Sequence, residues 1–229
     1  MSAGPSTDRR ERCARPLLIA FLVACAVDLV AVLAGGTGAH LVAKPLLMPL
    51  LAGYAVARRG PRPLVAALLL GWAGDVFLLA DADTAFLIGM GCFAAGHLCY
   101  LRLFGRARGA LLPGLLYAAV LAVFVTLIWG GLPAGLRIPL AGYSVLLTAM
   151  AYRSGVLGRC AAAGGALFLL SDGLIATGIA DWPQLPAPDF WIMLTYVAAQ
   201  LLLTLGALAP GTPCAGAGPG AYRERSISI

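Results

Sequence analysis

Residues 161–179, AAAGGALFLLSDGLIATGI, form a long apolar run in which Asp172 is the one charged residue. A helix of about 20 mainly apolar residues spans the hydrocarbon core of a bilayer, so this run predicts a transmembrane helix. Similar runs fill most of the remaining chain, at residues 17–34, 41–57, 64–80, 85–104, 111–130, 136–152 and 190–209. The sequence therefore predicts an all-α fold, a polytopic membrane bundle of about eight transmembrane helices.

The composition indicates the same class of protein. Of the 229 residues, 61% are hydrophobic and 11% are charged, and the mean hydropathy is +0.90, which is typical of multi-pass membrane proteins. We predict one membrane domain at residues 16–209, with disordered tails at 1–15 and 210–229. The helix at 41–57 is the least regular, because Lys44, Pro45 and Pro49 are expected to break its outer half.

The basic residues predict the orientation of the helices. If the N-terminus is cytoplasmic, an even number of helices places the C-terminus in the cytoplasm as well. The inside segments then contain Arg9, Arg10, Arg12, Arg15, Arg58, Arg59, Arg62, Arg102, Arg106, Arg108, Arg153, Arg159, Arg223 and Arg225. Lys44 and Arg137 lie outside, which agrees with the positive-inside rule. The net charge of +6 thus reflects membrane orientation and lipid headgroup contact, and nucleic-acid binding is not expected.

Three acidic residues, Asp28, Asp75 and Asp172, lie inside predicted spans. An aspartate at a helix centre costs roughly 2.5–3.5 kcal/mol on insertion scales, so such residues mark functional or paired positions. Counted at 1.5 Å per residue, all three lie roughly 8–10 Å below the outer surface. Two close carboxyls in a low-dielectric site supply one protonated and one ionised group, hence a general acid and a general base. The alternative is that they stabilise the bundle by pairing with Lys44 or His97, and for Asp28 both interpretations stay open.

Other polar residues are candidates for supporting roles. On the helix at 85–104, His97 and Tyr100 share a face with Gly89, Phe93 and Gly96, which describes an interior surface of small and polar residues. In the last helix, Tyr196 and Gln200 are four residues apart and so lie on one face, where they either reach the same cavity or join neighbouring helices.

Two other kinds of chemistry are not expected. His40 is the one further histidine and is expected in an outside loop, whereas zinc sites usually take three protein ligands, so we predict no metal. Ser171 precedes Asp172 but has no histidine at a suitable spacing, which disfavours a serine nucleophile.

An ordered set of these motifs resembles the YhhN/TMEM86 family. The set comprises Lys44-Pro45, Gly74-Asp75, Phe86, Gly89, Phe93, His97, Tyr100, Ser171-Asp172, Tyr196 and Gln200. The resemblance runs from about residue 41 to 205. It implies a multi-pass membrane enzyme, because the characterised members are lysoplasmalogenases, which hydrolyse the vinyl-ether bond of lysoplasmalogens.

The resemblance also implies the parts of the site. The family's two functional aspartates correspond to Asp75 and Asp172, whereas Asp28 is not carried over. One protonated and one ionised aspartate suit this chemistry without any cofactor, as in glycoside hydrolysis. Lys44 is expected to hold the phosphate of a lysophospholipid that enters from the bilayer. The arginine-rich and alanine-rich composition indicates a bacterial protein, with the cell membrane as its location.

Three other functions compete with this hypothesis. A proton-coupled transporter of small solutes or lipids also uses membrane carboxylates, and it would move a solute without changing any lipid covalently. An intramembrane aspartyl protease would need glycine at the position of Trp72 and tyrosine at that of Ser171. A non-catalytic lipid-binding or scaffold protein would tolerate asparagine at the buried aspartates.

Overall fold

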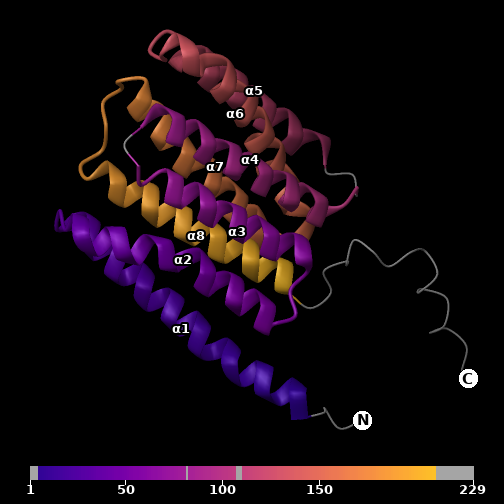
Figure 1. Cartoon of the computed structure of the whole chain (residues 1–229). Helices are drawn as coiled ribbons and strands as arrows, with labels where there is room; N and C mark the ends of the chain where they lie inside the picture. Colours follow the sequence, from indigo (N-terminus) through magenta and orange to yellow (C-terminus); the bar gives the residue numbers. More distant parts are fainter. Residues whose placement is uncertain (1–4, 81, 107–109, 210–229) are drawn as a thin grey trace, which may run out of the picture.

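In the computed structural model of the protein, which describes residues 5–80, 82–106 and 110–209, all regular elements are helical (Figure 1). In chain order they are α1 (Pro5–Leu33), α2 (Thr37–Ala57), α3 (Arg62–Phe77), α4 (Asp83–Phe104), α5 (Leu111–Ile128), α6 (Ala134–Ser154), the short 3-10 helix η1 (Gly155–Leu157), α7 (Arg159–Ile179) and α8 (Pro188–Leu208). The predicted all-α class is confirmed.

Within the described ranges, seven helices are long and apolar enough to cross a membrane, so this is a multi-pass membrane protein. The eighth long helix, α3, has 16 residues and is about 24 Å long, shorter than a hydrocarbon core of about 30 Å. It ends at Phe77 and not at residue 80 as predicted, because Leu78 and Leu79 already belong to the turn that leads to α4. Apolar composition alone does not set the last residue of a helix.

The second helix differs from its prediction. It runs unbroken from Thr37 to Ala57 through both of its internal prolines, so the expected break was wrong. Pro49 has no N–H, which leaves the carbonyl of Pro45 without its helical donor. The indole Nε1–H of Trp72 on α3 donates to that carbonyl at 2.9 Å. His40 therefore belongs to the first turns of α2 and not to an outside loop.

The first helix begins earlier than predicted. It starts at Pro5, so residues 5–15 are helical where we expected a disordered tail. Arg9, Arg10, Glu11 and Arg12 have moderate to high helix propensity, which lets the membrane helix continue beyond its apolar part. The tail predicted at 210–229 lies outside the described residues.

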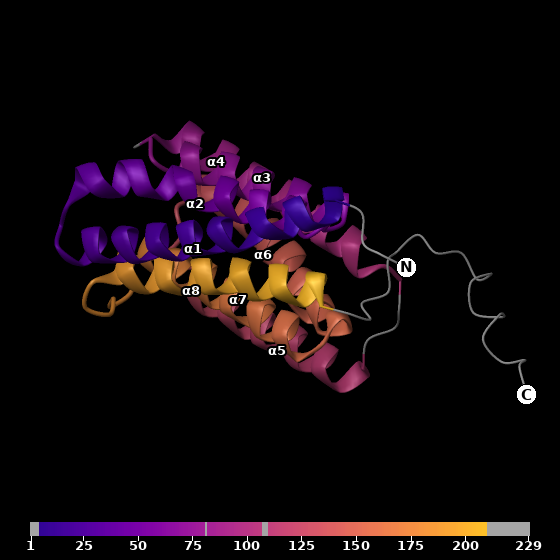
Figure 2. The same ribbon diagram turned by 90° about the horizontal axis from the view of Figure 1, so that it is seen from below.

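Helices that follow one another pack as pairs, α1 with α2, α3 with α4, and α7 with α8. At the centre, α8 also contacts α1, α2 and α3, while α6 contacts both α4 and α7. The edges of the bundle are α1 and α5, and α5 packs chiefly against α6 in the described part of the chain (Figure 1). Figure 2 shows that α1 starts, and α8 finishes, at the same end of the bundle.

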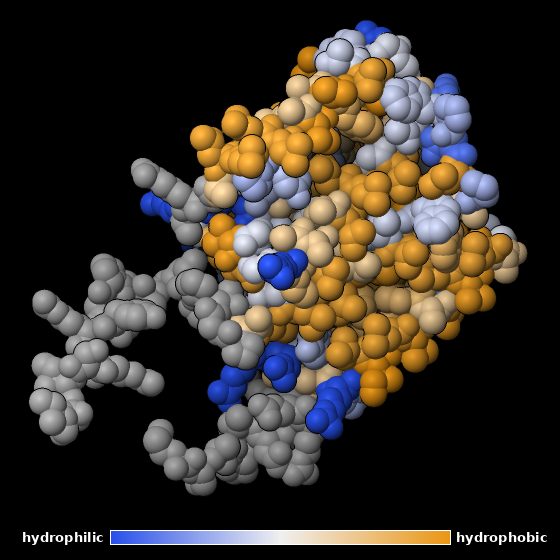
Figure 3. All heavy atoms as spheres, turned by 180° about the vertical axis from the view of Figure 1, so that it is seen from behind, coloured by the Kyte–Doolittle hydropathy of each residue, from blue (hydrophilic) through white to orange (hydrophobic). Residues whose placement is uncertain are grey.

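Small residues allow the central helices to approach closely. A side chain at Gly89 of α4 would place its Cβ 3.1 Å from the carbonyl oxygen of Gly74 on α3. A Cβ at Gly164 of α7 would lie 2.8 Å from the backbone nitrogen of Leu203 on α8. The outer surface is different, since apolar side chains cover most of the face in Figure 3 and hydrophilic ones lie mainly toward its two ends.

Candidate active site

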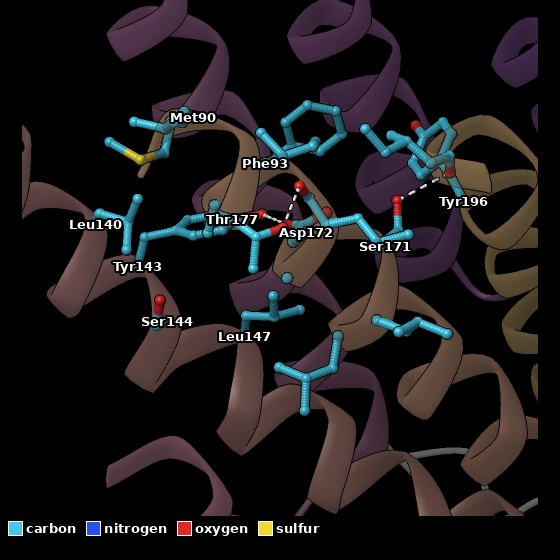
Figure 4. Close-up of a pocket in the computed structure, with 18 of the residues that line it drawn as sticks. Met90, Phe93, Leu140, Tyr143, Ser144, Leu147, Ser171, Asp172, Thr177 and Tyr196 are labelled. Carbon is cyan, nitrogen blue, oxygen red and sulfur yellow. Dashed lines mark hydrogen bonds between the residues drawn. The ribbon is translucent and has the colours of Figure 1, made fainter. Parts of the chain in front are cut away.

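A cavity of about 450 Å³ lies among the helices, with walls mainly from α4, α5, α6 and α7. Most of the described side chains that line it are apolar (Figure 4). The exceptions with a formal charge at neutral pH are Lys44 from α2, Asp75 from α3 and Asp172 from α7. The structure thus brings together the two aspartates and the lysine predicted from the sequence.

Asp172 is held by a hydrogen-bonded chain of three residues. The hydroxyl of Tyr143 on α6 donates to its Oδ2, and Figure 4 shows the two side chains pointing toward each other. Nε2 of His97 lies 3.1 Å from the same hydroxyl oxygen. Because a tyrosine hydroxyl carries one hydrogen, His97 is the donor to Tyr143 when Tyr143 donates to Asp172. His97 therefore reaches Asp172 only through Tyr143 in this chain of hydrogen bonds.

Asp75 is held by a second chain of hydrogen bonds. The hydroxyl of Tyr196 on α8 donates to Oδ2 of Asp75 at 2.7 Å. Gln200, one turn further along α8, donates to Tyr196 at 3.4 Å and accepts from the hydroxyl of Tyr100 at 2.6 Å. The absence of a side chain at Gly71 makes room, since a Cβ there would lie 3.2 Å from Nε2 of Gln200. Tyr100, Tyr196 and Gln200 thus form one buried network that ends at Asp75.

Aromatic rings pack around both chains of hydrogen bonds. Phe93 and Phe168 each meet the ring of Tyr196 edge to face, with centroids 6.0 and 5.6 Å apart. Phe168 also meets the His97 ring at 4.8 Å. Phe93 fits because Gly74 has no side chain, as a Cβ there would lie 2.6 Å from the ring. These contacts restrict the rotamers of the residues that hold the aspartates.

The two aspartates differ in their surroundings. Asp75 is 3% exposed, whereas Asp172 is partly exposed, and both line the cavity. Lys44 and Asp28 both interact electrostatically with Asp75, and Asp75 interacts electrostatically with Asp172. Lys44 is the one basic residue among the described side chains that line the cavity.

Asp28 does not belong to this cavity. It is fully buried, and its Oδ1 lies 2.8 Å from Nδ1 of His40 on α2, while its Oδ2 has no hydrogen-bond partner among the described residues. It is not among the side chains that line the cavity, although it interacts electrostatically with Lys44 and with Asp75. Its contact with His40 joins α1 to α2.

Sequence reasoning missed Tyr143, which contacts Asp172 directly. Ser144 and Thr148 of the same helix also line the cavity, and Oγ1 of Thr148 has no hydrogen-bond partner within the described ranges. The available signal was a cluster of hydroxyl groups in the middle of a membrane span. Such groups are less costly to bury than a charge, so they stand out less in the sequence.

Residues 39–207 match the sequence profile of the YhhN family. This chain belongs to the YhhN family. The matched region of the family includes all the cavity residues named above, whereas Asp28 precedes it. The predicted family is therefore confirmed.

Several curated proteins resemble the chain. The lysoplasmalogenase TMEM86B of Homo sapiens is 40% identical over 152 residues, which are 66% of this YhhN-family chain and 65% of the relative. The protein of the same name from Rattus norvegicus is 39% identical over 173 residues, with 73% and 72% covered. A lysoplasmalogenase of Mycobacterium tuberculosis is 35% identical over 195 residues, with 74% and 73% covered. The chain thus spans about two thirds of the human relative's length. No solved structure gave a significant match.

Proposed function

We propose that this protein is a lysoplasmalogenase, a membrane hydrolase that cleaves the vinyl-ether bond of a lysoplasmalogen. The products are a fatty aldehyde and glycerophosphoethanolamine or glycerophosphocholine. The observation that supports this function best is that two hydrogen-bonded aspartates and one lysine line a single, otherwise apolar cavity within the membrane domain. The names of the relatives from human, rat and Mycobacterium tuberculosis support the same reaction.

The reaction consumes one water molecule and needs an acid and a base. A protonated carboxyl first transfers its proton to the alkene carbon that is not bonded to oxygen, which creates an oxocarbenium ion at the carbon attached to oxygen. The ionised carboxylate stabilises this cation and then accepts a proton from water as the water oxygen bonds to that carbon. The resulting hemiacetal breaks its bond to the glycerol oxygen, which leaves an aldehyde and an alcohol.

We assign the acid to Asp172 and the base to Asp75. Asp172 is the more exposed of the two carboxyl groups that line the cavity, so it is the easier one for an alkene carbon to reach. Asp75 is the one with which the positively charged Lys44 interacts electrostatically. Tyr143 and Tyr196 then orient the two carboxyl groups through their hydrogen bonds.

The remaining parts of the cavity suit a lysophospholipid. An ammonium group such as that of Lys44 binds phosphate as a point charge. The apolar walls from α5, α6 and α7 suit an alkenyl chain. We place the protein in the cell membrane, where it takes its substrate from the surrounding lipid.

The deciding experiment measures aldehyde release from a lysoplasmalogen by the purified protein in detergent. Asp75→Asn and Asp172→Asn are each expected to lower the rate by about 10²–10⁴-fold, the usual range for loss of a general acid or base. Asp189→Asn is the matched control, because Asp189 is exposed at the start of α8 and does not line the cavity. No aldehyde from folded wild type, with either ethanolamine or choline headgroups, would contradict the assignment and favour a proton-coupled transporter.

A further inference from the structure

The cavity follows the long axis of α7. The α7 residues that line it extend from Ala166 to Ile179, a distance of about 20 Å along a helix. Asp172 lies near the middle of this length, so the cavity continues well past the proposed reacting groups. Between Ala166 and Asp172 the α7 residues that line the cavity are Leu169, Leu170 and Ser171. This length exceeds what a glycerophospho headgroup alone would need.

The cavity is also open at its side. Val120 on α5 and Leu170 on α7 both line it, and each is 51% exposed, so neither is covered by a neighbouring helix. Both residues lie near the middle of their helices, which in a membrane is the level of the lipid chains. Because α5 packs chiefly against α6 in the described residues, the α5–α7 boundary is loosely closed. At Gly173 of α7 the contact across this boundary is loose. A Cβ added there would lie 3.9 Å from the ring of Phe124 on α5, an ordinary van der Waals distance.

We infer that the single alkyl chain of the lipid substrate passes through this boundary, which we call the α5–α7 seam and define by Val120, Phe124 and Leu170. The inference rests on the proposed function. An opening at mid-depth faces lipid chains and not headgroups, so an alkyl chain is the ligand that fits it. The headgroup lies at the Lys44 side of the cavity. The vinyl ether, which joins chain and glycerol, then lies beside Asp172, two residues from Leu170.

This arrangement explains how a lipid reaches a buried aspartate pair without leaving the bilayer. The alkyl chain of the lipid stays in a hydrocarbon environment during entry, so it is never exposed to water. Only the small glycerophospho group has to move between helices. A substrate with one chain is expected to fit, since the opening has one apolar path between α5 and α7.

Bulky substitutions in the seam test this inference. Val120→Trp and Leu170→Trp are expected to raise the KM for a long-chain lysoplasmalogen about tenfold, since chain binding is obstructed. Both variants should lose much less kcat/KM for a water-soluble vinyl-ether analogue with the same headgroup and a two-carbon alkenyl group than for the long-chain substrate. Val123→Trp is the control, because Val123 is 59% exposed on the same helix and does not line the cavity. The inference would be wrong if all three variants changed the KM for the long-chain substrate equally. It would also be wrong if Val120→Trp and Leu170→Trp lost the same kcat/KM for both substrates.

A second measurement needs no turnover. A lysophosphatidylcholine with an ester-linked chain and a mid-chain diazirine is photolysed with the protein in bilayer nanodiscs, and the labelled peptides are identified by mass spectrometry. Labelling at the seam that excess unlabelled lysophosphatidylcholine suppresses is the expected result. Labelling confined to the outer faces of α1 and α8 would contradict it. Labelling at the seam without any aldehyde release would contradict the proposed function and would still support alkyl-chain binding at the seam.

Discussion

At the scale of single residues, hydroxyl groups rather than charged partners hold the two aspartates. Tyr143 and Tyr196 each direct one O–H toward a carboxyl group, which leaves the second carboxyl oxygen available to a ligand. The place of Asp75 and Asp172 in a shared cavity was predictable, because a charge inside a membrane is costly wherever it stands in the helix. The place of Tyr143 was not predictable, because its contact with Asp172 depends on how α6 packs against α7.

Removal of the Tyr143 hydroxyl tests its role in positioning Asp172. Tyr143→Phe is expected to lower kcat about 10-fold to 100-fold with little change in KM, since misplacement of a reacting group costs rate more than binding. Tyr152→Phe is the control on the same helix, because its hydroxyl donates to the Ala110 carbonyl away from the cavity. A loss of thermal stability that matches the loss of rate would instead indicate a structural role.

At the scale of helices, α7 and α8 pack closely together, and each contributes to one of the two chains of hydrogen bonds. Gly164 lies at this contact, with room for no side chain between it and the backbone of Ala199 and Leu203. The sequence showed small residues in these helices, but which of them meet was decided by the way the helices pack. The same limit applies to α2, whose internal prolines are accommodated by a bond from Trp72 on another helix.

A methyl group at Gly164 tests this contact. Gly164→Ala should destabilise the protein by about 1–3 kcal/mol, the usual cost of overpacking a tight interface. Gly142→Ala, on the open side of α6 where a Cβ would meet nothing within 4 Å, should leave stability unchanged or raise it. Thermal unfolding midpoints in one detergent would compare the two, and equal midpoints would show that α7 and α8 can separate without cost.

At the scale of the whole molecule, the beginning of α1 and the end of α8 share one end of the bundle. The short loops at that end carry arginines such as Arg58 and Arg106, while the opposite end carries Asp83, Asp189 and Trp182. This charge asymmetry predicts that both termini face the cytoplasm.

Labelling of single cysteines by a membrane-impermeant maleimide checks this orientation in a cysteine-depleted background. Asp83→Cys is expected to react in intact cells, and Arg58→Cys only after the cells are lysed, because both positions are exposed but lie at opposite ends of the bundle. The reverse pattern would invert the predicted topology and place the aspartates near the cytoplasmic leaflet.

The sequence by itself determined that this chain crosses a membrane as helices, that Asp75 and Asp172 lie inside such helices, and which family it belongs to. Apolar length and buried charge decide those points, and both are properties of a segment on its own. Only the tertiary structure decided that Asp28 pairs with His40 outside the cavity, that Tyr143 contacts Asp172, and that α5, α6 and α7 line one cavity with both aspartates. These features depend on which faces of distant helices meet, and that follows from the fit of small and large side chains across every interface at once.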